Sequence, residues 1–449
     1  MNRDSFRHLP SIRLILFVAF LIRLGIFGIA LWQANDLTIF HSKDTSTYLT
    51  PARELLASGN FAVNNVPEVI RTPGYPLFLT IGLFAHNVEV ITITLQIILS
   101  IISCYLIFLI GKIITNENSA RFAALLFCFE PLSITYAYYL LSETLFVFLI
   151  LLTFYYFVLF LKRDNYLNLI ASATVLVTAI YVRPIAYYLI IFWVILIFLK
   201  GKQFFRGGLL FLLLTFYPLG AWHVRNISRA DYNGFSAVSD VMLYFYHASS
   251  IEAQQKSLPL RQIIENKGYY DVKTYYQVHP EQQNWTESQR YEFWSQEGIA
   301  TIRKAPIMFT GIYLKGLGVT LLDPGSADFL RLLNQYPKSG SFTISVKSEG
   351  LIKIITANKL LVFISLLFLT YLICIYFFSL IGVRDLLKID NSSGRLLLIT
   401  CAYLFLLSGG VVAIARLRAP IMPFLLIIAG HGIALTFHKL KGNSFSDTN

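Results

Sequence analysis

Long apolar runs separated by short polar junctions dominate the pattern of hydrophobic and polar positions along the chain. A run of about 20 apolar residues is long enough to cross a bilayer as a helix. The pattern predicts spanning helices, with soft boundaries, over residues 12–33, 91–113, 119–140, 143–161, 166–182, 185–199, 207–222, 358–383, 396–413 and 419–437. A weaker run at 306–322 is interrupted by Lys315, Gly316 and Gly318. We therefore expect an all-α polytopic membrane protein with a bundle of about 10–12 transmembrane helices.

The basic residues predict the orientation of this bundle, because cytoplasmic loops carry an excess of Lys and Arg. Basic side chains flank three of the junctions: Lys112 and Arg121, Lys162 and Arg163, and Lys200, Lys202 and Arg206. The first apolar run follows three arginines and lacks a small-residue cleavage site, so we expect an uncleaved first helix with a cytoplasmic N-terminus. Two large non-cytoplasmic loops, 34–90 and 223–305, then lie together on the opposite face.

The orientation of the C-terminal helices depends on the weaker run. Arg384, Lys388 and Arg395 are cytoplasmic if 306–322 enters the membrane only partway, and the last three helices invert if it crosses completely. The sequence leaves both arrangements open. We divide the chain into a transmembrane module at 1–222, an outer-face region at 223–357 with the possible re-entrant helix, and C-terminal helices with a short tail at 358–449.

Composition agrees with a membrane protein and excludes several other classes. Hydrophobic residues make up 56% of the chain and charged residues 14%, whereas soluble domains have roughly 25% charged residues. The net charge of +12 is spread over junctions between apolar runs, so it does not indicate nucleic-acid binding. The four cysteines lie inside apolar runs without CxxC spacing, and the histidines show no metal-ligand spacing. We expect neither a cofactor nor a metal.

The first outer loop carries the residues best suited to chemistry. Asp44 follows the first helix, and a Pro-rich turn from Arg71 to Pro76 comes about 27 residues later. A carboxylate in such a place can deprotonate a hydroxyl, and an arginine can hold a phosphate with several donors. The alternative is a solvated loop with an incidental ion pair.

The pattern of this loop resembles that of the GT-C glycosyltransferases. It reads D-x3-Y-x4-R-E-x4-G-x-F from Asp44 to Phe61 and then R-T-P-G-Y-P from Arg71. The branch it resembles most contains the protein O-mannosyltransferases and the lipid A aminoarabinose transferases. Three further stretches fit this branch, from Pro131 to Glu143, from Trp222 to Asn226 and from Arg416 to Pro423.

The resemblance implies a transferase that uses a polyprenyl-phosphate sugar, of the undecaprenyl or dolichyl type, on the non-cytoplasmic face. It implies that Asp44 is the essential carboxylate, acting as the base of an inverting transfer, and that Arg71 holds the leaving phosphate. Two departures concern the donor. Thr45 stands where several relatives have a second acid, and Arg71-Thr-Pro-Gly replaces a Lys-Pro-Pro pattern.

Other candidates lie near predicted helix ends. Glu143 is expected either to cap its helix or to position the sugar or acceptor. The candidates for binding the donor phosphate or substrate, besides Arg71, are Tyr48, Tyr75, Arg183, His223, Arg225, Arg416 and Arg418. The alternative for the arginines is snorkelling to the membrane interface.

The favoured function is thus a membrane glycosyltransferase, of hexosyl or pentosyl type, in a bacterial inner membrane with a periplasmic active site. A polysaccharide polymerase or ligase would also have large outer loops and arginines, but it would not account for Asp44 and the Pro-rich turn. A lipid or solute transporter should place charges near the bilayer midplane in paired halves, and no half-repeat is visible. The sequence leaves the sugar open, and the acceptor can be a lipid, a glycan or a protein hydroxyl.

Overall fold

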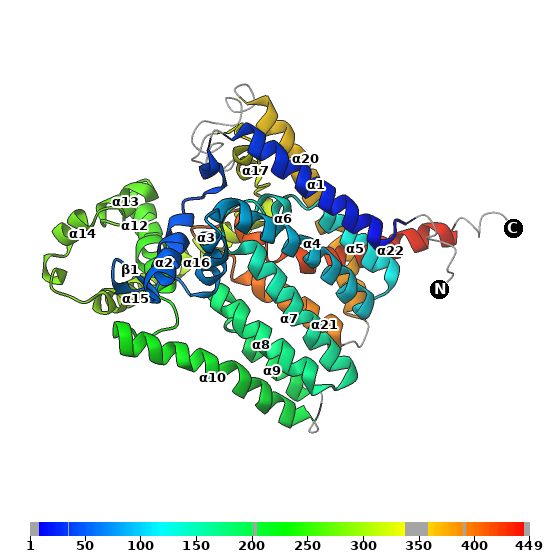
Figure 1. Cartoon of the computed structure of the whole chain (residues 1–449), viewed down its shortest axis with the longest axis horizontal. Coiled ribbons are helices and arrows are strands. Elements are labelled where there is room, and N and C mark those ends of the chain that lie inside the picture. The colour runs from blue at the N-terminus through cyan, green and yellow to red at the C-terminus, as the bar shows by residue number, and fades with distance from the viewer. Residues whose placement is uncertain are drawn as a thin grey trace.

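The computed structural model describes residues 9–34, 36–199, 201, 204–336, 358–388 and 392–443. These residues are almost entirely helical (Figure 1). Within them, the β-structure is one antiparallel pair of two-residue strands, β1 (Ala62–Val63) and β2 (Val66–Pro67). The predicted all-α fold is confirmed.

Most of the apolar runs form helices, but among the described residues fewer of these helices reach spanning length than the 10–12 that the pattern predicts. Among the described residues, six helices are long and apolar enough to cross a membrane: α1 (Ile12–Gln33), α4 (Val88–Ile114), α7 (Glu143–Arg163), α10 (Phe205–Ala230), α20 (Lys359–Leu386) and α22 (Met422–Asn443). Shorter apolar helices include α8 (Tyr166–Val182), α9 (Leu189–Leu199) and α21 (Ser392–Leu406). Large apolar side chains such as Trp32 and Phe363 remain exposed on these helices. They cover the surface that faces lipid, and the protein is an integral membrane protein.

The helices pack closely where small residues face one another. Gly432 on α22 and Gly382 on α20 bring these two helices so close that an added Cβ would overlap neighbouring backbone, and Gly430 on α22 lies equally close to the backbone of α5. Small residues allow such close backbone approach in membrane bundles. This packing fixes the position of α22, whose first residues follow a segment of the functional site.

Three of the predicted spans differ in the structure. The run at 185–199 forms the 3-10 turn η3 (Pro184–Ala186) and then α9, and the run at 396–413 is helical only as far as Leu406. The run at 119–140 forms α5 (Glu117–Cys128) and the short α6 (Pro131–Thr135), followed by turns up to Ser142. Pro131 has no N–H to continue α5, and the Glu130 carboxylate instead accepts from the backbone N–H groups of Leu132 and Ser133. The Gln96 amide donates to the carbonyls of Ala137 and Tyr139 and satisfies the irregular backbone. These turns place the start of α7 at the functional site.

The loop at 34–90 is folded. It contains η2 (Leu37–Phe40), α2 (Thr45–Ser58), the β1–β2 hairpin and α3 (Gly74–Phe84). The Gly59 backbone is left-handed, with φ of 74°, and ends α2. The Pro-rich turn leads into α3, whose first residue Gly74 lies against Tyr181 and Val182 of α8.

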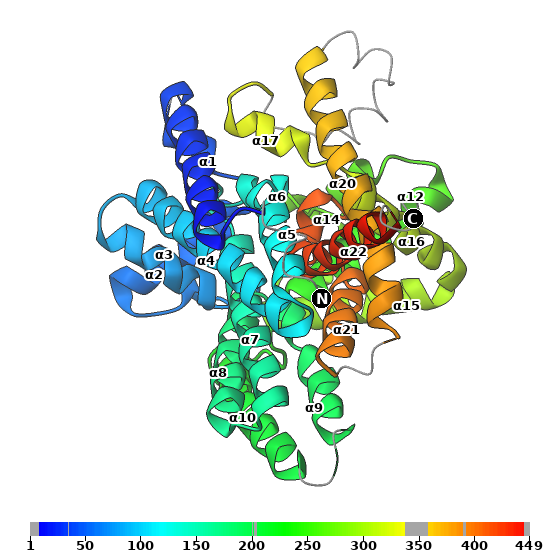
Figure 2. The ribbon, with the colours of Figure 1, turned by 90° about the vertical axis from the view of Figure 1, so that its right-hand side faces the viewer.

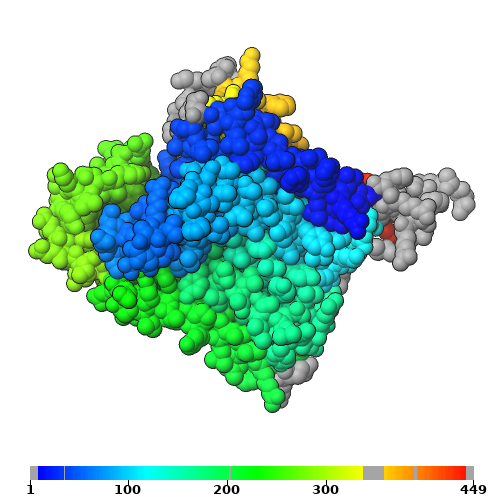
Figure 3. Space-filling view, in the orientation of Figure 1, coloured from blue at the N-terminus to red at the C-terminus, as the bar shows by residue number. Residues whose placement is uncertain are grey.

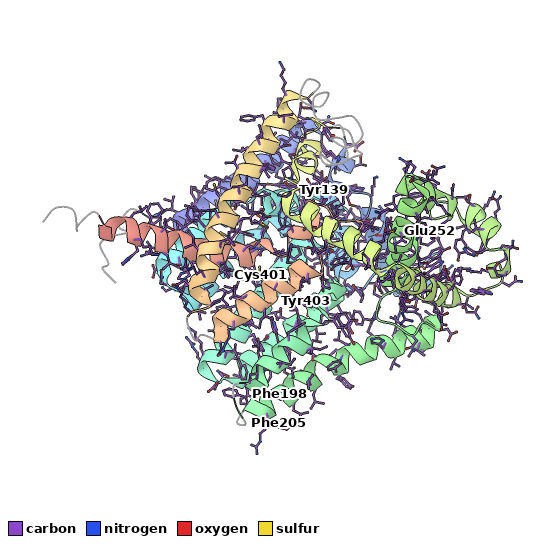
Figure 4. All side chains as sticks on the ribbon, turned by 180° about the vertical axis from the view of Figure 1, so that it is seen from behind. Tyr139, Phe198, Phe205, Glu252, Cys401 and Tyr403 are labelled. Atoms are coloured by element: carbon purple, nitrogen blue, oxygen red, sulfur yellow. The ribbon has the colours of Figure 1, made fainter. Side chains whose placement is uncertain are left out.

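The second long loop forms a separate lobe of small helices, which we call the outer lobe (residues 231–304) (Figures 1 and 3). Its elements are α11 (Val238–Val241), the π-helix η5 (Met242–Ala248), α12 (Ser249–Lys256), α13 (Leu260–Asn266), α14 (Val272–Val278), η6 (Pro280–Gln282) and α15 (Glu287–Lys304). In Figure 4, Glu252 marks this lobe, and Phe198 and Phe205 mark the turn between α9 and α10 at the far end of the body.

After the outer lobe the chain bends by 102° from α15 into α16 (Pro306–Leu322). The end of α16 reaches the middle of α20, where the Tyr376 hydroxyl donates to the Leu321 carbonyl at 2.8 Å. Then α17 (Ser326–Leu332) leads back toward the start of α20, since Ser326 hydrogen-bonds Ser365 at 2.6 Å. From Leu321 to Ser326 the chain thus runs from the middle of α20 back toward its start, and the re-entrant path stays a prediction.

At the opposite end of the body, the end of α20 and the start of α5 lie beside α22 (Figure 2). His431 on α22 contacts Asp385 at the end of α20 at 2.9 Å and Ser119 at the start of α5 at 3.4 Å. Lys112, one of the basic residues that predicted the orientation, pairs with Glu117 at 2.8 Å near this place. The two long loops thus lie at the opposite end of the helices from the described basic junction residues Lys112 and Lys162, the second of which donates to the Ile113 carbonyl.

Candidate functional site

Four segments that are distant in the chain meet at the end of the bundle below the outer lobe. Asp44 precedes α2, Glu143 is the first residue of α7, Arg183 follows α8, and Arg416 lies on the 3-10 helix η7 (Ala415–Arg418). With Arg71 of the Pro-rich turn they form what we call the carboxylate–guanidinium cluster.

Arg416 is the centre of this cluster. Its Nη1 donates to Asp44 Oδ2 at 2.5 Å and its Nε donates to Glu143 Oε1 at 2.5 Å. Arg183 Nη1 donates to the same Glu143 oxygen at 2.6 Å, and Arg71 Nη2 lies 3.6 Å from Asp44 Oδ1. Three guanidinium groups thus surround two carboxylates, and the cluster has a formal surplus of one positive charge.

The two carboxylates differ in access. The side chain of Glu143 is 1% exposed and that of Asp44 is 38% exposed. Burial would raise the pKa of Asp44, but the neighbouring guanidinium groups of Arg416 and Arg71 more than offset this and hold its pKa below the usual value. Asp44 is therefore an ionised carboxylate that an approaching molecule can reach.

Arg416 is likewise in its charged, protonated form. Burial acts to lower the pKa of Arg416, but the carboxylates of Glu143 and Asp44 prevail and raise it well above the usual value. A planar guanidinium can serve two carboxylates through separate N–H groups, which an ammonium cannot do with the same geometry.

Arg71 is held in place by α2. Its Nε donates to Thr47 Oγ1 at 3.0 Å, its Nη1 donates to the Tyr48 hydroxyl at 3.3 Å, and its guanidinium lies 4.5 Å from the centre of the Tyr48 ring. Tyr75 is fully buried, packs edge-on against Tyr48 at 5.1 Å and donates to Gln96 at 2.9 Å. Tyr48 thus contacts Arg71 of the cluster, and Tyr75 supports the position of Tyr48 by packing against it.

Three sequence-predicted candidates lie apart from the cluster. Arg225 donates to the carbonyls of Glu68 and Phe61 at 2.7 and 2.6 Å. His223 packs against aromatic rings, and Arg418 is buried and donates to the carbonyls of Thr320, Leu321 and Asp323. Of the arginines that the sequence suggested for a cationic pocket, Arg71, Arg183 and Arg416 lie in the cluster.

The structure adds one residue that the sequence reasoning did not select. Tyr246, on the π-helix η5, lies near enough to the cluster for the charge of Asp44 to act on it. Burial raises the pKa of its phenol, and Tyr269, Tyr270 and Asp44 raise it further. The Tyr246 and Tyr269 rings are 5.4 Å apart. The only signal in the sequence was the high tyrosine content of this loop.

The described part of the chain contains no group of three or more His, Cys, Asp or Glu side chains placed to hold a metal ion. Both carboxylates of the cluster are already engaged by guanidinium groups. That activity needs no metal stays a prediction.

A comparison with family models finds one match, to the dolichyl-phosphate-mannose-protein mannosyltransferase family, over residues 71–222. This range is about a third of the chain and includes Arg71, Glu143 and Arg183. No curated protein sequence matches the chain significantly.

Solved structures give wider matches at low sequence identity. The Archaeoglobus fulgidus oligosaccharyltransferase in its apo form aligns with a TM-score of 0.53 and 12% identity, over 99% of this chain and 52% of its own. The same enzyme tethered to an acceptor peptide aligns with a TM-score of 0.52 and 11% identity, over 96% and 50%. ArnT from Cupriavidus metallidurans bound to undecaprenyl phosphate gives a TM-score of 0.39 and 12% identity, over 93% and 77%.

The chain therefore spans about half the length of the oligosaccharyltransferase whose fold it shares. The alignment covers nearly all of this chain, so the similarity concerns the fold as a whole. The resemblance drawn from scattered motifs is confirmed, and this protein is an integral membrane protein with the fold of the GT-C glycosyltransferases.

Proposed function

We propose that this protein is a glycosyltransferase that moves a sugar from a polyprenyl-phosphate donor to a hydroxyl of an acceptor. The observation that carries the proposal is the carboxylate–guanidinium cluster, in which an accessible carboxylate lies among three guanidinium groups. The GT-C fold and the match to a family named for dolichyl-phosphate-mannose support it.

The guanidinium groups suit the phosphate of the donor. The cluster has a surplus positive charge before a donor binds, and arginine binds phosphate oxygens through paired N–H groups. Arg71 is well placed, because Thr47 and Tyr48 hold its Nε and Nη1, while its Nη2 makes only a long contact of 3.6 Å with Asp44 and can bond a phosphate. We assign Arg71 and Arg416 to the leaving phosphate and Arg183 to the support of Glu143.

Asp44 is the proposed base. It accepts the proton of the acceptor hydroxyl while the oxygen attacks the anomeric carbon and the bond from that carbon to the phosphate oxygen breaks. The lipid phosphate leaves with the bonding electron pair from the opposite face, so the configuration inverts. Because Arg416 and Arg71 would be shared with the phosphate, donor binding weakens their hold on Asp44 and makes it a stronger base.

Glu143 has a different proposed role. Its buried Oε1 anchors Arg183 and Arg416, while its Oε2 makes no hydrogen bond within the described residues. A buried carboxylate oxygen without a donor is costly. We assign Oε2 to a hydroxyl of the transferred sugar, hexosyl or pentosyl.

The proposal also covers the membrane face, the carrier lipid and the acceptor. We place the cluster on the non-cytoplasmic face, periplasmic in a bacterial inner membrane, with an undecaprenyl or dolichyl carrier. The acceptor is a lipid, glycan or protein hydroxyl that enters beneath the outer lobe.

The deciding experiment measures turnover of a lipid-phosphate sugar by the purified protein in lipid discs. Asp44→Asn should keep folding and donor binding but lose about 10²–10⁴-fold in rate, as expected when a general base is removed. Glu54→Gln is the matched control, because Glu54 accepts from the backbone of Asn65 in the same loop. Normal turnover by Asp44→Asn would refute the assignment, as would a dead Glu54→Gln or Glu143→Gln beside an active Asp44→Asn.

A further inference from the structure

A groove separate from the carboxylate–guanidinium cluster lies between the outer lobe and α16. Its volume is about 810 Å³, within the range of about 300–1,000 Å³ for sites that hold a small organic molecule. We call it the α16 groove. It is lined by one face of α16, by the α12–α13 junction and by the loop after α21. The lining includes Ile307, Gly311, Lys315 and Gly316 on α16 and Gly410 in the loop.

The groove is closed by tight packing at Gly316 and is open at Gly311. Gly316 lies directly against the backbone of Gly410, so that the loop after α21 is seated on α16. The same loop continues into η7, which carries Arg416. By contrast, a Cβ at Gly311 would meet no atom within 4 Å, because this part of the helix faces the open groove.

The groove opens toward the surface that lipid covers. On α16, Ile307, Leu314 and Leu322 are 88%, 59% and 63% exposed. A helix with this apolar surface in a membrane protein is surrounded by acyl chains. The apolar wall of the groove is therefore within reach of the lipids of the same leaflet.

One cation interrupts the apolar lining. Of the residues that line the groove, all within the described ranges, Lys315 alone is charged. Its ammonium makes no ion pair or hydrogen bond to any described residue. On α12 and α13, which meet at the groove, the acidic side chains Glu252 and Glu265 are already paired, Glu252 with Lys256 and Lys267 and Glu265 with Arg261.

An unpaired ammonium beside a lipid-facing apolar surface needs an anion, because charges in this environment are stable only when paired or hydrated. The phosphate of an anionic lipid is the anion that a membrane supplies there. The same molecule supplies an acyl chain for the apolar wall.

We propose that the α16 groove binds an anionic phospholipid of the surrounding leaflet, with its acyl chain along α16 and its phosphate on Lys315. The bound lipid seals the gap between the outer lobe and α16 and supports the loop that carries Arg416. The proposal concerns lipid binding and does not depend on the transferase activity.

The test uses the full-length protein in phosphatidylcholine discs that contain a minor fraction of phosphatidylglycerol with a diazirine in its acyl chain. After photolysis, the label should map to 307–319 and 253–260. A phosphatidylcholine probe with the same diazirine should label these peptides about fivefold less, the preference expected from one lysine near an anionic head group.

Four variants decide the matter. Lys315→Gln should abolish the preference for phosphatidylglycerol, and Lys315→Arg should keep it. Gly311→Leu should fill the groove and remove the label with either probe. Gly318→Leu is the matched control, because Gly318 lies on the same helix, does not line the groove and also has open space around its Cβ position.

Three results would overturn the proposal. They are an unchanged preference in Lys315→Gln, equal loss of label in the two leucine variants, or displacement of the label by polyprenyl phosphate at amounts that leave bulk phospholipid in excess. The last result would assign the groove to the donor instead.

Discussion

At the scale of single residues, the candidate site depends on which side chains share a partner. Arg416 joins Asp44 to Glu143, which are 99 positions apart in the sequence, through hydrogen bonds of 2.5 Å each. Arginines at other helix ends have the same chemistry but different partners. Arg225 and Arg418 donate to backbone carbonyls, so their N–H groups are occupied by the fold itself.

This contrast makes a prediction about Arg71 and Arg225. Arg71→Ala should weaken donor binding by about tenfold or more with little change in stability, because it removes a charge-assisted donor to the phosphate. Arg225→Ala should instead lower the free energy of unfolding by about 1–3 kcal/mol, because it removes the side-chain donor of the Glu68 carbonyl and one of the two donors of the Phe61 carbonyl. Donor titration and thermal unfolding of both variants separate the two effects. Equal donor affinities in wild type and Arg71→Ala would contradict the assignment.

The lowered pKa of Asp44 predicts the pH dependence of the reaction. A carboxylate whose pKa in the folded protein lies below its unfolded value stays ionised until the pH falls below about 3.9. The base form of Asp44 is therefore fully present at neutral pH and is lost only when the pH falls to the acidic range below the usual pKa of an aspartate. We expect kcat/KM, which reports on the free enzyme, to be flat between about pH 7 and pH 5.

The measurement is a pH series in lipid discs with a subsaturating donor. An acidic limb centred near pH 6 would show that a group with a raised pKa controls the rate, and Asp44 would then not be the base. The same sign applies to stability, since the ion pair of Asp44 with Arg416 contributes above the unfolded pKa and is lost as pH falls through the folded pKa.

At the scale of elements, short irregular segments position the site, and long helices hold these segments. The Pro-rich turn places Arg71 by starting α3 against α8, where Gly74 lies at the backbone of Tyr181. The turns after α6 place Glu143, and η7 places Arg416 just before α22. Each of these segments is fixed by packing at a helix end.

The contact of Gly74 makes a prediction at this scale. Gly74→Ala should push α3 away from α8, because the added Cβ would lie 2.7 Å from the Tyr181 backbone. Overpacking of this kind typically costs about 1–3 kcal/mol. Because Arg71 precedes the displaced helix, turnover should fall as well.

Gly220→Ala on α10 is the control, since a Cβ there meets no atom within 4 Å. Thermal unfolding and turnover of the two variants provide the comparison. A Gly74→Ala protein as stable and active as Gly220→Ala would show that the close approach does not position Arg71.

At the scale of the whole molecule, the outer lobe and the loop at 34–90 lie at one end of the helices and the basic junctions lie at the other (Figures 1 and 4). This separation supports a single reaction face. It also agrees with the proposal that α16 enters the body and returns, because α20 then begins at the end where the outer lobe lies.

Cysteine accessibility tests this arrangement. In a background without reactive native cysteines, Asn60→Cys and Gln283→Cys should react with an impermeant maleimide from one side of sealed vesicles. Asn165→Cys and Leu387→Cys should react only from the other side. All four positions are exposed in the structure. Labelling of Asn60→Cys and Leu387→Cys from the same side would invert the C-terminal helices and contradict the re-entrant path of α16.

The sequence by itself determined the class of the protein, because the hydrophobic effect acts on local composition. Apolar runs of spanning length predict membrane helices, and among the described residues six such helices lie within or across predicted runs. The GT-C resemblance followed from local motifs, and the fold comparison confirms it. The break at Pro131 could also have been foreseen from the missing N–H of proline.

The tertiary structure alone decided which charged residues form a site. Arg416 and Arg418 are two residues apart on the same short helix, yet the first bridges two carboxylates and the second is buried against carbonyls. A sequence pattern gives a side chain's type and approximate depth, but not its direction. The direction is set by the packing of helices from distant parts of the chain, as where α22 fixes η7 beside the starts of α2 and α7.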